Sequence, residues 1–553
     1  MKIISKDKIS AFLKKYWIGI LAAVLVIAVI ASSVEIYKEE VLNIDPDIEY
    51  KEQSTLYLPS ENIDTFNPVI SQSQDVYYLS KLIYNSLFTF DEQLNVVPEL
   101  ADEYTVDTER AYIEVKLKNG VKWHNGKKLT ASDVAFTVSA MRAAGTNCPY
   151  YNKVKKINSA FAKGNDTVAI YFNNNYNCSL DDLTFPIVPS SQYSSAGAFV
   201  AAKDDFKPVG TGQYKYKSYN KKKQLRLTAN KNYFGQKADR NITVTLLPDR
   251  DLASNMMEIN SVTCYVDSSS NRKSSASDRG YQILDIPSNN VEFLVFNTRS
   301  SALSQKDMRK ALAYGIDVSK ILDNAYMGDG ILTDTIYYPN YLGVTDTLKD
   351  YSYDLKKAEQ LVSSLGFRDV NGDGAKENPQ GQKFTLKILV DKKNATRNSA
   401  AQIIKNNLDT LGLDAYVESL PRAEYNQAIK RKDFDILVTG FTIEENYDLR
   451  NFFNGSNDWG YYNYDLFMKS RELDRLYTPD EYRAKYRELK DALIDELPYY
   501  PLCYKKMSLI GVDTFKAEKL PMFNNIYKNC DTWSWSVIVE KNNDEEDKNT
   551  LKN

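Results

Sequence analysis

The sequence contains a single histidine, His124, and this limits the chemistry that the chain can perform. Ser/His/Asp and Cys/His catalysis both need an imidazole as general base, so His124 would be the only candidate. No serine or cysteine motif lies near it, and the HExxH motif of zinc hydrolases needs two histidines. We therefore expect His124 to make structural hydrogen bonds, and we predict that the protein is no enzyme and has no cofactor.

A second group of possible ligands is the sequence D-x-N-x-D-G at residues 369–374, which matches the first half of a calcium-binding loop. Asp369, Asn371 and Asp373 would supply oxygen ligands. The twelfth position of such a loop is Gln380, where calcium loops have a bidentate glutamate. We favour a glycine turn without metal, so no metal site is predicted and calcium binding is the alternative.

The candidate ligand-binding residues are Phe441, Glu444, Glu445 and Asn446, which follow an apolar stretch at residues 434–439. The stretch has the composition of a buried strand, and ligands of α/β proteins bind at the carboxyl ends of strands. A carboxylate in a poorly solvated cleft is a good partner for an ammonium group. An exposed acidic loop is the alternative, and the two adjacent glutamates leave the register open.

The elements that would position such residues are clearest between Pro98 and Met141. Residues 112–117 alternate polar and apolar side chains, which is typical of a half-buried strand. The Asn119-Gly120 pair predicts a tight hairpin turn, followed by a return strand at residues 121–123. The hairpin would then lead into a helix.

This helix is predicted to begin after Thr130, because threonine is a favoured N-cap residue. Asp133, three residues later, completes an acidic variant of the capping box. Val134, Val138 and Met141 follow at helical spacing and form an apolar stripe.

The same stretch resembles the signature of the extracellular solute-binding proteins of peptide-type ABC importers, the oligopeptide-, dipeptide- and nickel-binding class. The resemblance covers about Ser54 to Trp535 and implies a periplasmic-binding-protein-like, two-lobed α/β fold of the three-domain, peptide-binding class. The matching sequences are Pro98-Glu-Leu-Ala101, Leu117-Lys-Asn-Gly-Val-Lys-Trp-His-Asn-Gly126, Leu129-Thr-Ala-Ser-Asp-Val134 and Pro208-Val-Gly-Thr-Gly-Gln-Tyr214.

The resemblance also suggests roles for the candidate ligand-binding residues. In the peptide-binding relatives the sequence after the buried strand is G-W-x-x-D, and the aspartate pairs with the α-amino group of the peptide. Carried over, Phe441 takes the tryptophan position and Glu444 the aspartate position, so both positions depart from the family pattern. A single histidine weakens the nickel-binding branch, because transition-metal sites usually need imidazole or thiolate ligands.

Size and composition fit a globular protein of several lobes, since 553 residues are too many for one small core. With 70 Lys and Arg against 73 Asp and Glu, the balanced charge gives no reason to expect a nucleic-acid partner. The predicted segments are a basic cytoplasmic tail (1–15), a membrane anchor or signal (16–34), a stalk (35–53), lobe I (54–89, 207–293 and 503–540), a small lobe with the signature (90–206), lobe II (294–502) and a disordered tail (541–553).

Residues 16–34 are uncharged and follow five lysines. Nineteen residues at helical rise span about 28 Å, enough to cross a bilayer core. The lysines place the N-terminus inside the cell and the binding domain outside. A signal peptide cleaved near residues 31–33 is the alternative. Relatives in single-membrane bacteria are usually tethered through a lipidated cysteine, whereas the first cysteine here is Cys148, so we expect an uncleaved, single-pass anchor.

Three local expectations complete the sequence-based picture. Residues 76–88 predict a helix, and the serine-rich residues 268–280 predict a loop. Of the five cysteines, Cys148 and Cys178 are the pair to test for a disulfide, with free buried thiols as the favoured alternative.

These observations together predict the extracellular substrate-binding component of an ABC importer. It would capture peptides or a similar small amine-bearing solute by hinge closure and deliver them to permease and ATPase subunits. A membrane-tethered peptide sensor or accessory protein of the same fold, without transport, is the alternative.

Overall fold

The computed structural model describes residues 48–540 except 174–178, 204–205, 349, 445–447, 474 and 476. The chain divides into two units, residues 54–533 and the two chain ends. In the unit formed by the ends, strands β1 (Ile48–Glu52) and β21 (Ser536–Glu540) pair antiparallel. Among the described residues, no helix is both long and apolar enough to cross a membrane. The predicted anchor at residues 16–34 and the predicted tail from residue 541 lie outside the described residues.

The first sheet of the larger unit has the strand order β2-β11-β10-β9. Strand β2 is paired in parallel with β11, and the other pairs are antiparallel. Segments more than 150 residues apart along the sequence therefore share one sheet. The strands are β2 (Thr55–Ser60), β9 (Tyr214–Asn220), β10 (Gln224–Ala229) and β11 (Asn241–Leu246).

Helix α2 (Gln74–Ile83) follows this first strand, and Ser73 caps it by accepting a hydrogen bond from the backbone of Val76 (3.3 Å). The helix ends at Ile83, so the predicted helix over residues 76–88 extends too far at its C-terminal end. The carboxylate of Glu99 accepts hydrogen bonds from the Asn85 amide (2.7 Å) and the Ser86 backbone (2.6 Å). These bonds favour an extended chain after Ile83, because the Ser86 backbone N–H and the Asn85 side chain bind Glu99 and not a carbonyl of the helix.

The signature stretch lies in a second, antiparallel sheet with the order β5-β6-β8-β7. Its capped helix is confirmed: Asp133 accepts from the Thr130 backbone (2.9 Å), and Val134, Val138 and Met141 are buried. The elements are β5 (Ala101–Asp107), β6 (Tyr112–Leu117), α3 (Ala131–Ala144), α4 (Tyr151–Val154), β7 (Ile157–Lys163), β8 (Thr167–Phe172) and α5 (Ala196–Ala201).

The predicted hairpin between residues 112–117 and 121–123 is wrong. Strand β6 pairs with β5 and β8, and Lys122 instead forms an isolated bridge with Lys128. Gly120 has a φ of +80°, but Asn119 is not left-handed. A two-residue hairpin turn of the predicted type needs positive φ at both positions, so the chain leaves the sheet here.

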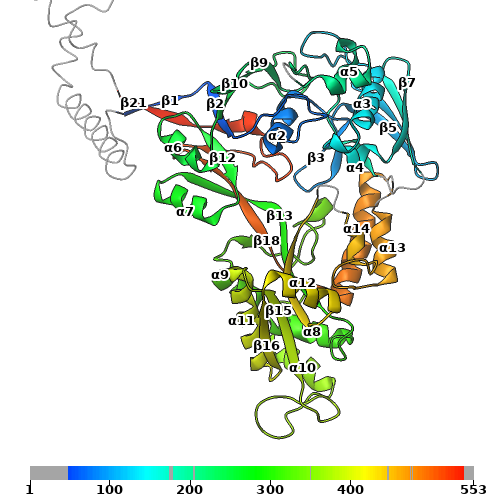
Figure 1. Ribbon diagram of the computed structural model, residues 1–553, viewed down its shortest axis with the longest axis vertical. Coiled ribbons are helices and arrows are strands. Elements are labelled where there is room, and N and C mark those ends of the chain that lie inside the picture. Colours follow the sequence, from blue (N-terminus) through cyan, green and yellow to red (C-terminus); the bar gives the residue numbers. More distant parts are fainter. Residues whose placement is uncertain are drawn as a thin grey trace, which may run out of the picture. The chain divides into compact units, whose positions relative to one another are not determined.

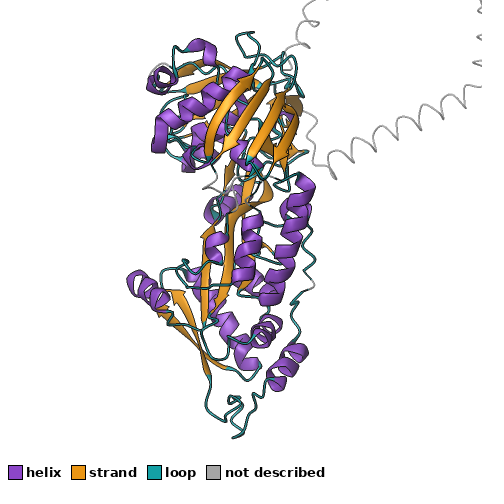
Figure 2. Ribbon diagram, turned by 90° about the vertical axis from the view of Figure 1, so that its right-hand side faces the viewer, coloured by secondary structure: helices purple, strands orange, loops and turns teal. Residues whose placement is uncertain are grey.

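The third sheet is mixed and has seven strands, in the order β12-β18-β13-β17-β15-β16 with β14 paired to β18. Its strands are β12 (Cys264–Asp267), β13 (Gln282–Phe296), β14 (Gly330–Ile331), β15 (Thr385–Asp391), β16 (Asp414–Leu420), β17 (Ile436–Thr442) and β18 (Tyr499–Gly511). The helices of this region are α8 (Lys306–Gly315), α9 (Val318–Ala325), α10 (Leu355–Ser364), α11 (Ala395–Thr410), α12 (Arg422–Arg431), α13 (Tyr464–Glu472) and α14 (Pro479–Glu496), and Figures 1 and 2 show them beside the strands.

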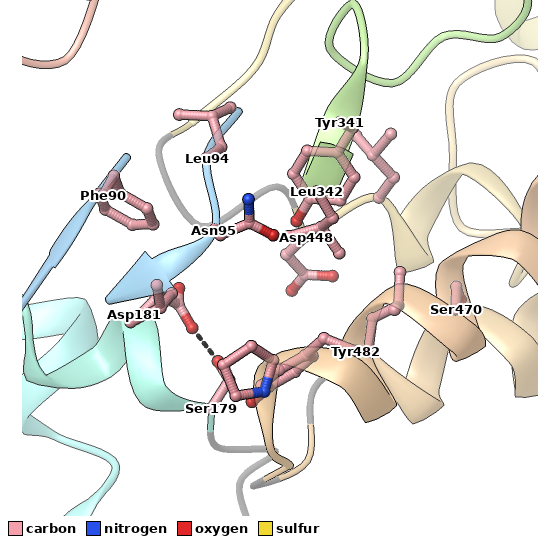
Figure 3. A pocket seen from close by; sticks show the side chains of 14 residues that line it. Phe90, Leu94, Asn95, Ser179, Asp181, Tyr341, Leu342, Asp448, Ser470 and Tyr482 are labelled. Atoms are coloured by element: carbon pink, nitrogen blue, oxygen red, sulfur yellow. Dashed lines mark hydrogen bonds between the residues drawn. The ribbon is translucent and has the colours of Figure 1, made fainter. Parts of the chain in front are cut away.

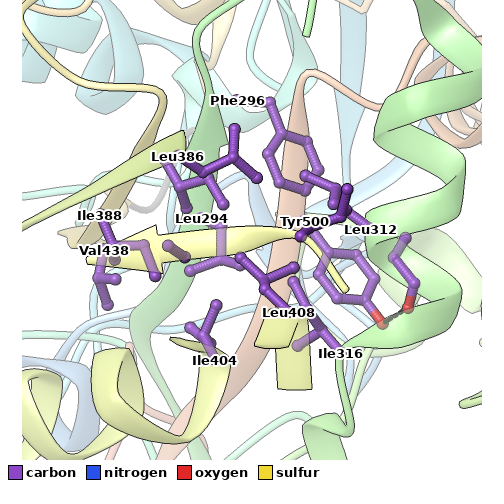
Figure 4. Close-up of a cluster of buried hydrophobic side chains, with 14 of the residues drawn as sticks. Leu294, Phe296, Leu312, Ile316, Leu386, Ile388, Ile404, Leu408, Val438 and Tyr500 are labelled. Atoms are coloured by element: carbon purple, nitrogen blue, oxygen red, sulfur yellow. Dashed lines mark hydrogen bonds between the residues drawn. The ribbon is translucent and has the colours of Figure 1, made fainter. Parts of the chain in front are cut away.

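A hydrophobic core lies between these strands and helices. Figure 4 shows Leu294 and Val438 from strands meeting Leu312 and Leu408 from helices. At the start of helix α14, the Thr478 backbone donates a hydrogen bond to Glu481 (2.7 Å) and completes a capping box. Alternating strands and helices around one core are the α/β architecture that the sequence predicts.

The serine-rich stretch forms helix α7 (Ser270–Asp278), so the predicted loop is wrong. Ser269 caps the helix, and Asp267 accepts hydrogen bonds from the Ser269 backbone (2.6 Å) and the Arg272 side chain (2.5 Å). Caps and ion pairs replace the missing apolar stripe, which is why periodicity did not reveal this helix.

Candidate functional site

A cavity with a volume of about 480 Å³ lies among the described residues. Among its lining residues Glu444 is the only acidic one and Lys153 the only basic one. The others are serines, amides, four aromatic residues, a proline and a methionine. They are Ser71, Gln72, Ser73, Gln74, Tyr77, Tyr78, Pro149, Tyr150, Asn152, Lys153, Ser268, Ser288, Asn289, Asn290, Glu444, Met507, Phe523 and Asn524.

Glu444 reaches this cavity from the end of β17. The adjacent Ile443 is buried and is bonded to Asn289 in both directions, through backbone N–H to O (2.8 Å) and through the Asn289 amide to the Ile443 carbonyl (2.8 Å). Thr442 donates to the Asn290 side chain (2.5 Å). The backbone before Glu444 is thus fixed, while its carboxylate is exposed and has no recorded hydrogen bond or ion pair to a described residue.

The part of the wall next to the end of β17 is formed by an irregularity in the β13–β18 ladder. Pro287 is opposite Lys506 and Val291 is opposite Tyr504, so three residues of β13 stand against one residue of β18. These three residues, Ser288, Asn289 and Asn290, all line the cavity. Such bulges re-aim side chains, and here they turn polar groups toward the cavity.

A buried ion pair lies beneath the strand that carries the candidate residues. Glu292 is 2% exposed and accepts two hydrogen bonds from Arg397 (2.7 and 3.0 Å) and one from Tyr326 (3.1 Å). Burial acts to lower the pKa of Arg397, but the bonds to Glu292 raise it above its usual value. A Cβ on Gly440 would lie 2.4 Å from Arg397 and 2.6 Å from Glu292, so only glycine fits over this pair.

The other sequence-predicted ligand residues are placed differently from Glu444. Phe441 is 44% exposed, packs edge-on against Phe452 (5.1 Å between ring centres) and is not among the residues that line the cavity. Glu445 and Asn446 lie outside the described residues. Of the two predicted residues that the structure describes, Glu444 lines the cavity and Phe441 does not.

The sequence did not single out the aromatic residues of the cavity. Tyr77 and Tyr150 are stacked (5.9 Å, 29°), Tyr78 packs edge-on against Tyr77 (5.4 Å), and Phe523 lies on the same cavity. The chain has 40 tyrosines, and nothing in the sequence near Tyr77, Tyr78 or Tyr150 distinguishes them from the others.

His124 joins two parts of the family-like sequence. Its Nδ1 accepts from the Gly210 backbone (3.2 Å) and its Nε2 faces the Gly212 carbonyl (3.0 Å), which fixes the neutral tautomer with the proton on Nε2. Burial lowers the pKa of His124 to about 4. The ring makes structural hydrogen bonds, as the sequence predicts. The backbone at Gly210 is also tightly packed, since a Cβ there would lie 1.7 Å from the Ile83 carbonyl oxygen.

The possible calcium loop is closed by its own hydrogen bonds. Asp369 accepts from the backbones of Gly372 (2.7 Å) and Gly374 (2.9 Å), and Glu377 accepts from Val370 and Asn371 (2.8 Å each). Within the described part of the chain, no group of three or more His, Cys, Asp or Glu side chains is arranged to hold a metal ion. Calcium binding by Asp369, Asn371 and Asp373 stays an untested alternative to the predicted glycine turn without metal.

Four cysteines, Cys148, Cys264, Cys503 and Cys530, are buried free thiols. Burial raises the pKa of Cys148, Cys503 and Cys530 to about 12, which keeps them protonated. Cys178, the suggested partner of Cys148, lies outside the described residues.

Comparison with known proteins gives a consistent picture. The sequence profile of the family described as "Bacterial extracellular solute-binding proteins, family 5 Middle" matches residues 95–463. The oligopeptide-binding protein AppA of Bacillus subtilis is 25% identical over 495 residues, covering 85% of this chain and 89% of AppA. The dipeptide-binding protein of Escherichia coli is 25% identical over 436 residues, covering 72% of this chain and 78% of that protein. The crystal structure of the ABC transporter substrate-binding protein CtaP of Listeria monocytogenes has the same fold, with a TM-score of 0.63, 20% identity, and coverage of 87% and 99% of the two chains.

Proposed function

This chain belongs to the family of bacterial extracellular solute-binding proteins, family 5, and from that membership we propose that it is the extracellular substrate-binding component of an ABC importer, capturing peptides or a similar small amine-bearing solute. The observation that carries this proposal is the carboxylate of Glu444. Among the described residues it is the only acidic group on a cavity of about 480 Å³, whose other lining side chains are one lysine and neutral polar, aromatic and apolar groups. The relatives named above are oligopeptide- and dipeptide-binding proteins.

The proposed ligand contact is a charge-assisted hydrogen bond between Glu444 and an ammonium group. Such bonds are about twice as strong as neutral ones, especially where water is excluded. The serines and amides of the cavity would bind peptide backbone groups, and the aromatic rings would cover apolar side chains. Because the ligand is bound and released unchanged, affinity is set by these contacts less the cost of hinge closure between the lobes.

The predicted anchor at residues 16–34 extends this proposal to the membrane. A single-pass helix with the N-terminus inside would hold the binding domain beside the permease and ATPase subunits. N-terminal sequencing of the mature protein tests the anchor: a sequence that starts near Met1 supports it, and a start near Val34 would show that the segment is a cleaved signal.

The binding site is tested with the full chain purified in detergent. Native mass spectrometry identifies any solute carried from the cells, and fluorescence titration with di-, tri- and pentapeptides gives Kd. Glu444→Gln should weaken binding by roughly tenfold to a hundredfold, which corresponds to a lost charged hydrogen bond of about 1.5–3 kcal/mol. The matched control is Glu424→Gln, an exposed glutamate of α12 that does not line the cavity.

Acetylated peptides make this experiment specific for the ammonium group. N-acetylation should weaken binding to the unmodified protein about as much as Glu444→Gln does, and it should have little further effect on that variant. Equal affinity for acetylated and free peptides would show that Glu444 does not bind an ammonium group.

A sensor or accessory protein that binds a peptide without transport is the second candidate. It is favoured by the sequence before Cys148, which contains no cysteine for the lipid anchor that transport relatives in single-membrane bacteria usually carry. Peptide uptake by cells with and without the gene separates the two: loss of uptake on deletion supports the importer, and unchanged uptake supports the sensor.

A further inference from the structure

A second, much smaller cavity of about 40 Å³ lies apart from the proposed ligand site and shares no lining residue with it. Its walls come from two distant parts of the sequence. Asn95 follows strand β3 (Phe88–Phe90), and Asp181 belongs to the short 3₁₀ helix Leu180–Leu183. Asp448 and Tyr482 come from the second half of the chain, and Figure 3 shows all four around one space.

Asn95 lines this cavity, is 8% exposed, and has an unpaired side-chain oxygen. Its amide nitrogen donates to Asp91 (2.9 Å), and this bond fixes which way the amide faces. The opposite atom, Oδ1, is buried and has no hydrogen-bond partner. A buried acceptor without a donor costs about 1–3 kcal/mol, so such an atom points to a missing partner.

Asp181 presents a second unpaired oxygen. The residue is 8% exposed, one carboxylate oxygen contacts the Ser179 hydroxyl, and the other, Oδ2, is buried without a partner. Two residues that line this cavity, from different elements, thus each carry a buried acceptor without a described donor.

The charges around the cavity leave Asp181 uncompensated. Asp182 pairs with Lys156 (2.8 Å), and Asp448 pairs with Arg450 through hydrogen bonds that include one of 2.6 Å. No ion pair to Asp181 is recorded among the described residues. Among the described residues these are three carboxylates and two cations, and Asp181 has no described counter-ion.

We propose that this cavity binds a calcium ion, with Asn95 Oδ1, Asp181 Oδ2 and the carboxylate of Asp448 as protein ligands. Calcium takes oxygen ligands in flexible geometry, and an amide oxygen with one or two carboxylates is an ordinary donor set. A water needs on the order of 10–15 Å³ of such space, so about 40 Å³ has room for the ion and one or two waters. Magnesium is expected to bind more weakly, because it demands strict octahedral geometry and dehydrates reluctantly.

The contrast with the D-x-N-x-D-G loop supports this assignment. That loop resembles a calcium site in sequence, yet both carboxylate oxygens of Asp369 accept backbone N–H groups of the loop itself. The small cavity has no calcium motif in the sequence, yet it holds the acceptors that lack donors. A group of two carboxylates and one amide is also consistent with the absence of a cluster of three acidic, histidine or cysteine ligands in the described residues.

Bound calcium would link the segment predicted as the small lobe to the segment predicted as lobe II. Two hydrogen bonds already join them near the cavity: the Leu342 backbone donates to the Gln93 carbonyl (2.8 Å), and the Leu180 backbone donates to the Tyr482 hydroxyl (3.3 Å). The ion would add a third connection between the same two segments.

Isothermal titration of the EDTA-treated full chain with calcium chloride tests the proposal. We expect one saturable site in the unmodified protein, with at least tenfold weaker binding in Asp181→Asn, which keeps the size of the side chain. Asn95→Ala is the second variant and should weaken binding in the same direction. Asp369→Asn is the matched control and should leave the affinity unchanged.

Thermal unfolding gives an independent readout in the unmodified protein. One millimolar calcium should raise Tm more than the same concentration of magnesium, and EDTA should remove the increase. The proposal is overturned if the unmodified protein binds no calcium, or if Asp369→Asn abolishes binding while Asp181→Asn retains it. Neither outcome bears on peptide binding by Glu444, because the probe is the metal alone.

Discussion

His124 should make the stability of this protein decrease in mild acid. In the folded protein its Nδ1 accepts from Gly210 and its Nε2 faces the Gly212 carbonyl, so the ring is bound as the neutral form. A second proton would be placed on Nδ1, where it faces the Gly210 N–H and breaks that hydrogen bond. Burial disfavours the charged ring as well and lowers the pKa of His124 from 6.5 to about 4.

The direction and size of the change in the free energy of unfolding follow from this difference in pKa. Between pH 6.5 and 4 the unfolded chain binds more protons than the folded one, so stability falls as pH falls through this window. Above pH 6.5 the histidine contributes no pH dependence. A difference of about 2.5 in pKa corresponds to about 3 kcal/mol at most, fully lost only below pH 4. Burial raises the pKa of Asp182 to about 7, and that group acts in the opposite direction over the same range.

Because of Asp182, the test compares two proteins and does not use one pH profile alone. Urea unfolding is measured from pH 7.5 to 4.5 for the unmodified chain and for His124→Gln, whose side chain does not titrate. The unmodified chain should lose about 2–3 kcal/mol relative to the variant between these pH values. The single histidine of the sequence gives one set of imidazole NMR signals, so its pKa can be read without assignment. An imidazole that titrates at pH 6 or above in the folded protein, or a stability difference independent of pH, would refute this reasoning.

Three further predictions test the packing of the fold. Gly210→Ala should destabilise the protein by more than about 4 kcal/mol in urea unfolding, because the new Cβ meets the Ile83 carbonyl. Its control is Gly197→Ala, where the new Cβ meets only Ser195 Oγ at 3.9 Å, and this variant should be neutral or mildly stabilising. Asp133→Ala should cost about 2–4 kcal/mol, since this buried carboxylate accepts from Trp123, Thr130 and Ser190; a loss below 1 kcal/mol would contradict that estimate. Ellman's reagent at pH 8 should label at most one thiol in the folded chain, because four cysteines are buried. Labelling of two or more thiols would be inconsistent with the structure. The number of thiols labelled after unfolding is five if all cysteines are free and three if one disulfide is present.

Periodic patterns allowed much of the fold to be predicted. Helix α11 and strand β15 bury the apolar residues expected from their spacing, since a side chain's face is fixed by the helical or strand period alone. The local errors have local causes: Glu99 ends helix α2 early, and caps and ion pairs support helix α7, which has no apolar stripe.

The candidate site could be predicted only in part. Glu444 was marked by its place after a buried strand, and this position does reach the cavity. Tyr77, Tyr150, Asn289 and Phe523 are brought there by long-range pairing of strands and helices, so no short stretch of sequence identifies them. The unpaired oxygens of Asn95 and Asp181 depend in the same way on which side chains fold together.

The irregularity at Ser288–Asn290 shapes the cavity wall, whereas the paired strands around it form the scaffold. Two residues more on β13 than on β18 create this part of the wall. Regular pairing precedes it up to Pro287 and follows it at Val291 and Glu292, before a second irregularity between Glu292 and Phe293. Deleting two of the three residues would restore an even ladder and shorten the wall while leaving both flanking registers in place. Insertions or deletions at this one point could therefore change which ligands a protein with this scaffold binds, without changing the scaffold itself.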